Sequence, residues 1–142
     1  MKNIFTFLAL FFFVTICSGQ GKIVGLWKNV DDEDGKDKSH IQISEENGKL
    51  VATVVKLLPA ATLKVCSSCK GSNKNKPIEG MRILWDLKKV TDTEYDGGQI
   101  LNPKTGKIYD CFITLETADK LKVRGYMGIS LVGKTQYWYR VK

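Results

Sequence analysis

The side chains with the most capacity for chemistry in this 142-residue chain are cysteines and one histidine. Cys66 and Cys69 form a Cys-Ser-Ser-Cys motif, Cys111 stands alone, and His40 is the only histidine. Two cysteines at this spacing form a disulfide, bind zinc or act as a redox pair. In an oxidising compartment we expect a Cys66 to Cys69 disulfide that pins a loop, with Cys111 as a buried thiol. A zinc site built from these four side chains and a redox pair are the alternatives.

Two further motifs resemble binding sites, but their context argues against both. Residues 128–135 satisfy the P-loop pattern, yet a P-loop leads into a helix, and the residues that follow, 136–142, are β-formers. Residues 31–35 resemble a calcium loop, but Val30 and Ile41 occupy its first and last ligand positions. No nucleophile elbow or zinc-binding helix motif is present. The sequence therefore predicts no enzyme, no cofactor and no metal.

The N-terminus has the layout of a secretory signal peptide. Lys2 precedes a predominantly apolar run over residues 4–16, which ends in small residues. The run is shorter than the roughly 20 residues that a transmembrane helix needs. We expect a signal peptide at residues 1–19, one domain at residues 20–142, and export to the periplasm or the medium. Lipidation at Cys17 is the alternative, which the bulky residue before it disfavours.

The charge of the chain indicates solubility more than a nucleic-acid partner. The formal net charge is +7, but only three residues are arginines and the lysines are dispersed. One basic cluster, at residues 70–76, lies beside Pro77 in an expected loop.

The remaining sequence predicts about eight β-strands joined by short turns. Residues rich in β-branched and aromatic side chains, or alternating between polar and apolar, cover 23–28, 39–44, 50–58, 81–87, 94–101, 108–116 and a C-terminal hairpin within 121–140. Asn47-Gly48 favours a tight hairpin, and Gly97-Gly98 favours a bulge or bend. Residues 81–87 also repeat at helical spacing, and we favour a strand. Because sequential hairpins need no crossover connections, we predict an all-β fold, a single antiparallel up-and-down barrel.

A resemblance supports this barrel. Gly25-Leu26-Trp27, together with an arginine in the last strand, resembles the calycin superfamily, which includes the lipocalins. In that superfamily the Gly-x-Trp tryptophan is covered by a basic side chain from the final strand. The resemblance therefore implies that Trp27 plugs one end of the barrel and packs against Arg140.

A second resemblance covers essentially the whole chain after the leader. Residues 97–111, 121–128 and 133–140 resemble the exported bacterial family called domain of unknown function 2147, and Trp27, Gly35, Ile41 and the Cys66/Cys69 pair fit as well. Asn102 departs from the aspartate expected before the proline, which argues against a catalytic or cation-binding turn. The family name carries no activity, so the resemblance implies fold and export only.

The predicted function is a non-enzymatic binding protein of the cell envelope for a small apolar or amphipathic ligand. Small barrels with a wide interior hold one such ligand, which needs a cavity of roughly 300 Å³ or more. The expected lining residues are aromatic side chains from several strands: Trp85, Tyr109, Tyr126, Tyr137 and Trp138. The alternative is a monomeric interaction or structural module with a filled barrel, in which the loop at residues 66–77 contacts a partner protein or an anionic surface.

Overall fold

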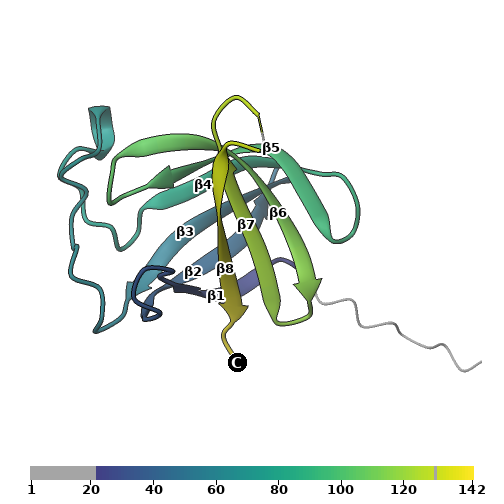
Figure 1. Cartoon of the computed structure of the whole chain (residues 1–142), viewed down its shortest axis with the longest axis horizontal. Helices are drawn as coiled ribbons and strands as arrows, with labels where there is room; N and C mark the ends of the chain where they lie inside the picture. The colour runs from purple at the N-terminus through teal and green to yellow at the C-terminus, as the bar shows by residue number, and fades with distance from the viewer. Residues whose placement is uncertain (1–21, 130) are drawn as a thin grey trace, which may run out of the picture.

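The computed structural model describes residues 22–129 and 131–142, which form a closed barrel of antiparallel strands in sequential order (Figure 1). The strands are β1 (Gly25–Val30), β2 (Asp37–Glu46), β3 (Lys49–Leu57), β4 (Arg82–Lys89), β5 (Glu94–Asn102), β6 (Lys107–Thr117), β7 (Lys120–Tyr126) and β8 (Gly133–Arg140). Each strand pairs with the next, and β8 pairs with β1 to close the barrel. The predicted all-β up-and-down barrel is confirmed. The expected signal peptide and Cys17 lie outside the described residues.

Helical structure within the described part of the chain is limited to one 3-10 turn, η1 (Gly71–Asn73), in the longest connection. No helix of the described residues is long and apolar enough to cross a membrane.

The sharp turn and the bend that the sequence predicts are both present. Asn47 and Gly48 have φ angles of 53° and 78°, which build the tight turn between β2 and β3. Gly97 has a φ of 74° where the register between β5 and β6 shifts, between Tyr95 and Gly98. This shift is a β-bulge, and it bends β5 where the sheet must curve.

Strand β4 confirms the strand predicted at residues 81–87. A bulge in it changes which of its side chains face the barrel interior. Asp86 has a φ of 61°, and the fully buried Leu84 and Leu87 lie on either side of the bulge with two residues between them. Leu84 pairs with Ala52 of β3, whereas Trp85 lies opposite Gln99 of β5. Trp85 therefore faces away from the side chains that fill the barrel.

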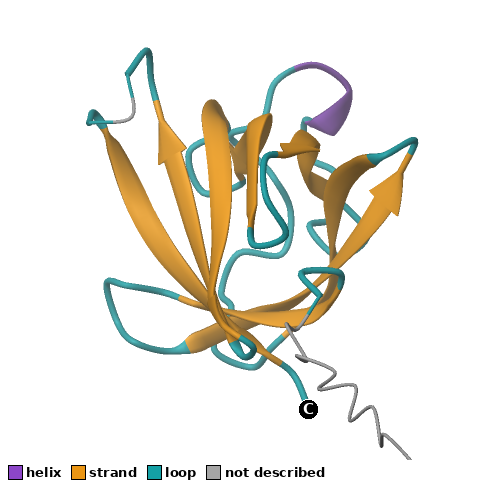
Figure 2. Ribbon diagram, turned by 90° about the vertical axis from the view of Figure 1, so that its right-hand side faces the viewer, coloured by secondary structure: helices purple, strands orange, loops and turns teal. Residues whose placement is uncertain are grey.

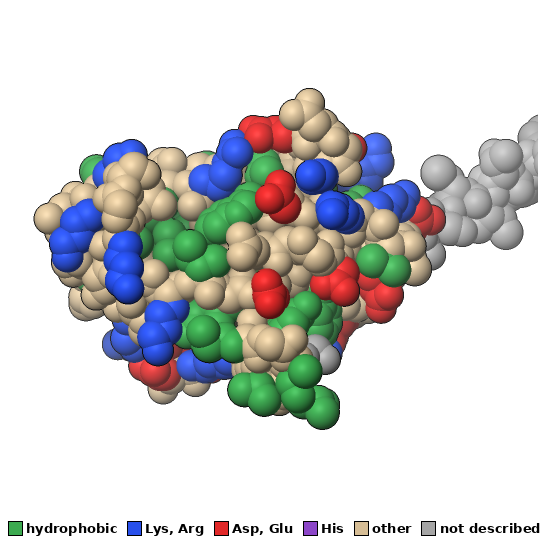
Figure 3. All heavy atoms as spheres, turned by 90° about the horizontal axis from the view of Figure 1, so that it is seen from above, with side chains coloured by type: hydrophobic (Ala, Val, Ile, Leu, Met, Phe, Trp, Pro, Cys, Tyr) green, Lys and Arg blue, Asp and Glu red, His purple; other side chains and the backbone are tan. Residues whose placement is uncertain are grey.

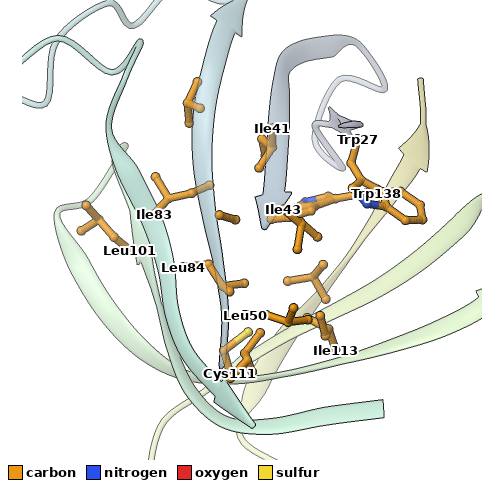
Figure 4. Close-up of a cluster of buried hydrophobic side chains, with 14 of the residues drawn as sticks. Trp27, Ile41, Ile43, Leu50, Ile83, Leu84, Leu101, Cys111, Ile113 and Trp138 are labelled. Carbon is orange, nitrogen blue, oxygen red and sulfur yellow. The ribbon is translucent and has the colours of Figure 1, made fainter. Parts of the chain in front are cut away.

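The barrel interior holds a cluster of buried apolar side chains from seven of the eight strands, to which β5 adds the half-buried Ile100, and Figure 4 shows part of this cluster. Directly opposed residues of antiparallel strands share one face of the sheet, so a residue that faces the interior places its partner on the same inner face. The largest side chains of this core are fully buried: Trp27, Ile41, Ile43, Leu50, Leu84, Leu87, Ile113, Leu121 and Trp138.

The connections between strands lie at alternate ends of the barrel. We call the end with residues 31–36, 58–81, 103–106, 127–129 and 131–132 the mouth, and the end with the short β2–β3, β4–β5 and β6–β7 turns the base. In Figure 1 the β7–β8 turn lies at the top and η1 at the upper left, from which the long β3–β4 connection runs down the left side, and in Figure 2 both η1 and the β7–β8 turn lie at the top. The mouth therefore carries the long loop and the base carries only tight turns.

Candidate functional site

Trp27 lies at the base, where β1 begins, and is fully buried. Its indole Nε1 donates a hydrogen bond to the Ile23 carbonyl oxygen at 2.8 Å, and the guanidinium carbon of Arg140 lies 4.3 Å from the ring centroid. Arg140 lies directly opposite Trp27 in the β1–β8 pairing and donates to the carbonyl oxygens of Ala118 and Lys22. The guanidinium thus joins β8, the β6–β7 turn and the segment before β1, and the pair closes the base.

The mouth carries the disulfide that the sequence predicts. Cys66 and Cys69 are bonded to each other and buried, within the long β3–β4 connection. Val65 forms an isolated bridge with Pro77, and the Cys66 amide donates to the Lys76 carbonyl oxygen at 2.9 Å. Because the two sulfurs bond to each other, neither is a thiolate that could bind zinc. No group of three or more metal-ligating side chains lies among the described residues.

The disulfide loop packs closely against the β5–β6 turn. Cys66 Sγ lies 3.3 Å from the Pro103 carbonyl oxygen, and because a disulfide sulfur has no hydrogen to donate, we regard this approach as a packing contact. Gly106 has a φ of 72°, and a Cβ built on it would lie 1.9 Å from the Ser68 carbonyl oxygen. The turn therefore requires glycine at this position, because the positive φ is unfavourable for other residues and because a side chain would overlap the Ser68 carbonyl oxygen.

Asn102 holds the same turn in shape. Its side-chain oxygen accepts a hydrogen bond from the Lys104 amide at 3.0 Å, and its carbonyl oxygen accepts one from the Gly106 amide at 2.8 Å. An aspartate would accept the first bond equally well. The asparagine that stands here in place of the expected aspartate therefore preserves the turn. Lys104 Nζ lies 2.8 Å from a carboxylate oxygen of Glu33, which ties the turn to the β1–β2 connection. The packing of the disulfide loop against the β5–β6 turn was not predicted from the sequence.

Two of the five aromatic residues predicted to line the interior face inward. Trp138 is 1% exposed and lies opposite Leu121 of β7. Its Nε1 donates to Gln136 Oε1 at 3.4 Å. Tyr109 shares the inner face of β6 with Cys111 and is half-buried near the mouth.

The other three aromatic residues lie on the outer face, and their predicted place in the interior is corrected. Trp85 Nε1 donates to Gln99 Oε1 at 3.2 Å, outside the β4 bulge. Tyr137 lies opposite Lys122 and under the ammonium of Lys120, 4.3 Å from its ring centroid. Tyr126 lies opposite Asp110, and its ring centroid is 6.1 Å from that of Phe112. The alternation set by Leu121 and Val123 already places Tyr126 outward, so the sequence held this signal.

Two hollows among the described residues open to solvent. One, of about 220 Å³, lies over the β4–β5 turn and β6 and is lined in part by Val90, Asp96 and Phe112. The other, of about 310 Å³, is lined in part by Asn47, Arg82 and Trp85. Neither is lined by Trp138 or Tyr109, so neither is an interior cavity for a ligand.

Cys111 should resist thiol reagents until the barrel unfolds. It is fully buried on the inner face of β6, and burial, with a smaller contribution from the Asp96 carboxylate, raises the pKa of its thiol from 9.0 to about 12. Because the thiolate is the reactive form, the folded chain should hold roughly 1,000-fold less of it than the unfolded chain. Iodoacetamide at pH 8 without reductant, read by mass spectrometry, should label Cys111 only in urea. Labelling of Cys66 or Cys69 in either state would contradict the disulfide.

The β7–β8 turn exposes an unexpected number of aliphatic side chains. Met127, Ile129, Leu131 and Val132 are 55%, 60%, 86% and 60% exposed. We call these four residues the apolar tip. The stretch that mimics a P-loop overlaps it and leads into β8, a strand and not a helix.

Comparison with known proteins gives a family and a fold. The family described as "Uncharacterized protein conserved in bacteria (DUF2147)" matches residues 25–140. The structure of the Helicobacter pylori protein HP1028, described as belonging to the lipocalin family, is similar with a TM-score of 0.76 and 23% identity, over 86% of this chain and 84% of that one. A redesigned β-barrel is similar with a TM-score of 0.47 and 16% identity, over 84% of this chain and 91% of its own. No curated protein sequence matches the chain significantly.

Proposed function

Starting from the fact that the chain belongs to the DUF2147 family of uncharacterized bacterial proteins, we propose that it is an exported, non-enzymatic interaction module of the cell envelope. Its barrel serves as a packed scaffold, and its contacts are made from the outer surface at the mouth. The observation that carries this proposal is the apolar core of the barrel, because buried side chains from seven strands, with the half-buried Ile100 of β5, lie where a ligand would bind.

Two features support the proposed location. The Cys66 to Cys69 disulfide is typical of proteins in oxidising compartments and is rare in the reducing cytosol. The sequence of residues 1–19 has the layout of an export signal. Both features agree with a protein that acts outside the cytoplasm.

The competing function, a calyx for a small apolar or amphipathic ligand, has the lipocalin-like fold in its favour. A calyx needs an enclosed space open to solvent. Of its predicted lining residues, Trp138 is packed in the core, and Trp85, Tyr126 and Tyr137 face outward. Packing of the barrel explains the interior aromatic side chains without a ligand.

A fluorescence titration separates the two functions. Trp27 and Trp138 report on the interior, so a ligand that entered the barrel would change their emission. We expect no saturable change when the chain from Gln20 onward is titrated with monomeric decanoate, indole and an anilinonaphthalene dye. That chain contains every strand of the closed barrel.

A matched variant tests any positive result of this titration. Gly125 lies on the inner face opposite Cys111, and a Cβ there would meet Ile100 and Tyr109 at an ordinary 3.4 Å. Gly125→Val therefore narrows the mouth of the interior from within. A saturable emission change that this variant abolishes would overturn the filled-barrel function and establish the calyx.

A further inference from the structure

We propose that the apolar tip inserts into an anionic lipid surface and that the lysines of the β3–β4 connection attract the mouth to it. The inference rests on the proposed outer-surface function and names its partner. It joins two features of one end of the barrel: the apolar tip and a group of exposed lysines that we call the lysine loop, comprising Lys64, Lys70, Lys74 and Lys76.

The composition of the tip is not explained by the needs of a turn. Tight hairpin turns favour glycine, asparagine and aspartate, as at Asn47-Gly48. The β7–β8 turn instead presents four exposed apolar side chains, of which Leu131 is 86% exposed. Contiguous apolar exposure on a soluble protein marks an interaction site.

Backbone hydrogen bonds hold the tip in shape. The Met127 amide donates to the Val132 carbonyl oxygen at 3.0 Å, and the Val132 amide donates to the Ile129 carbonyl oxygen at 3.0 Å. Ordering the backbone therefore adds little cost when the tip enters a new environment.

The chemistry of the tip fits a lipid phase better than a protein pocket. Protein interfaces concentrate their binding energy in tryptophan, tyrosine and arginine side chains that fill matching pockets. The apolar tip has no aromatic and no charged side chain, and it stands at the end of the β7–β8 hairpin. Acyl chains are fluid and can cover such a convex tip without a preformed pocket.

The charge around the mouth favours an anionic surface. Within the described part of the chain, Lys64, Lys70 and Lys76 form no ion pair, and Lys74 donates to the Ser67 carbonyl oxygen. Basic side chains gather over the left edge of the face seen in Figure 3, the side on which Figure 1 shows the long connection. The acidic β1–β2 connection opposes them little, because three of its carboxylates are paired with lysines: Asp32, Glu33 and Asp34.

The two features together supply what stable attachment requires. A short apolar insertion alone binds membranes only marginally, and a second signal such as basic residues makes the attachment stable. Lysines close to an anionic leaflet provide that signal, and salt weakens it.

The test is flotation of the chain from Gln20 onward with vesicles. We expect it to float with vesicles that contain about 30% phosphatidylglycerol, to float less at high salt, and to float weakly with pure phosphatidylcholine. The double variant Ile129→Ser, Leu131→Ser should lower partition by at least about tenfold. Its matched control is Val90→Ser, because Val90 is 61% exposed at the base. Unfolding midpoints should stay unchanged, since all three side chains are exposed.

A second pair of variants tests the electrostatic part. Lys70→Gln with Lys76→Gln should lower partition about fivefold for each lysine, on anionic vesicles only. Lys88→Gln, near the base, is the matched control and should have no effect. Lys74 is left in place because it contacts the backbone of its own loop.

Three results would overturn the lipid inference. These are no flotation of the unmodified chain, equal flotation of the tip variant, or dimers in sedimentation that only the tip variant loses, which would assign the tip to a second copy. None of them touches the proposed outer-surface function, which fails only if the fluorescence titration finds a ligand inside the barrel.

Discussion

Trp27→Ala will lower the free energy of unfolding by about 3–5 kcal/mol. The indole is fully buried, donates to the Ile23 carbonyl oxygen and stacks under the Arg140 guanidinium. Truncation leaves a cavity at the base, an unpaired carbonyl oxygen and a cation without its aromatic partner. Urea titration followed by circular dichroism measures the loss.

Two controls separate the role of Trp27 from a general effect of losing an aromatic ring. Tyr139 faces outward and is 39% exposed, so Tyr139→Ala should cost less than about 1 kcal/mol. Trp27→Phe retains much of the buried area but removes the Nε1 donor, and its cost should fall between the two. A loss below about 1 kcal/mol for Trp27→Ala would show that the base is not closed by this residue.

Gly106→Ala should lower the free energy of unfolding by roughly 3 kcal/mol and loosen the disulfide loop. The φ of 72° is strained for alanine, and the new Cβ would overlap the Ser68 carbonyl group. Relief requires the loop to move off the turn. Urea titration gives the stability, and hydrogen exchange of residues 66–76 reports the movement.

Gly48→Ala is the matched control for this second prediction. Gly48 has a φ of 78°, but a Cβ added there would meet no atom within 4 Å, so only the backbone strain of about 1–2 kcal/mol remains. Its effect on exchange of the disulfide loop should be nil. Equal costs at both glycines, or unchanged exchange in Gly106→Ala, would show that the docked loop contributes nothing.

The sequence was sufficient for the fold because the relevant signals are local. Alternation of apolar residues marks β2 and β6, Asn47-Gly48 marks the turn between β2 and β3, and Gly97-Gly98 marks the bend in β5. The contact between Trp27 and Arg140 spans the chain, and it could be expected only through a resemblance to known barrels. The disulfide was expected from the spacing of the two cysteines together with the predicted export.

The parts that could not be predicted depend on bulges and on long-range packing. Asp86 adopts a positive φ without being glycine, and this single residue moves Trp85 to the outer face. The fit of Gly106 against Ser68 joins two segments that carry no shared pattern. The exposure of the apolar tip could not be predicted either, because its residues are typical of β-strands.

The seam between β1 and β8 has a consequence for how the molecule forms. It joins the first strand to the last through only three residue pairs, between residues 27–29 and 138–140. The other strand pairs join strands that are consecutive in the sequence, all but β3–β4 through short turns, whereas the seam must wait for the last strand to be made. Until then the growing meander has two open edges, and open edges invite pairing with other chains. A ribosome that stalls before β8 therefore releases an aggregation-prone sheet and not a smaller barrel.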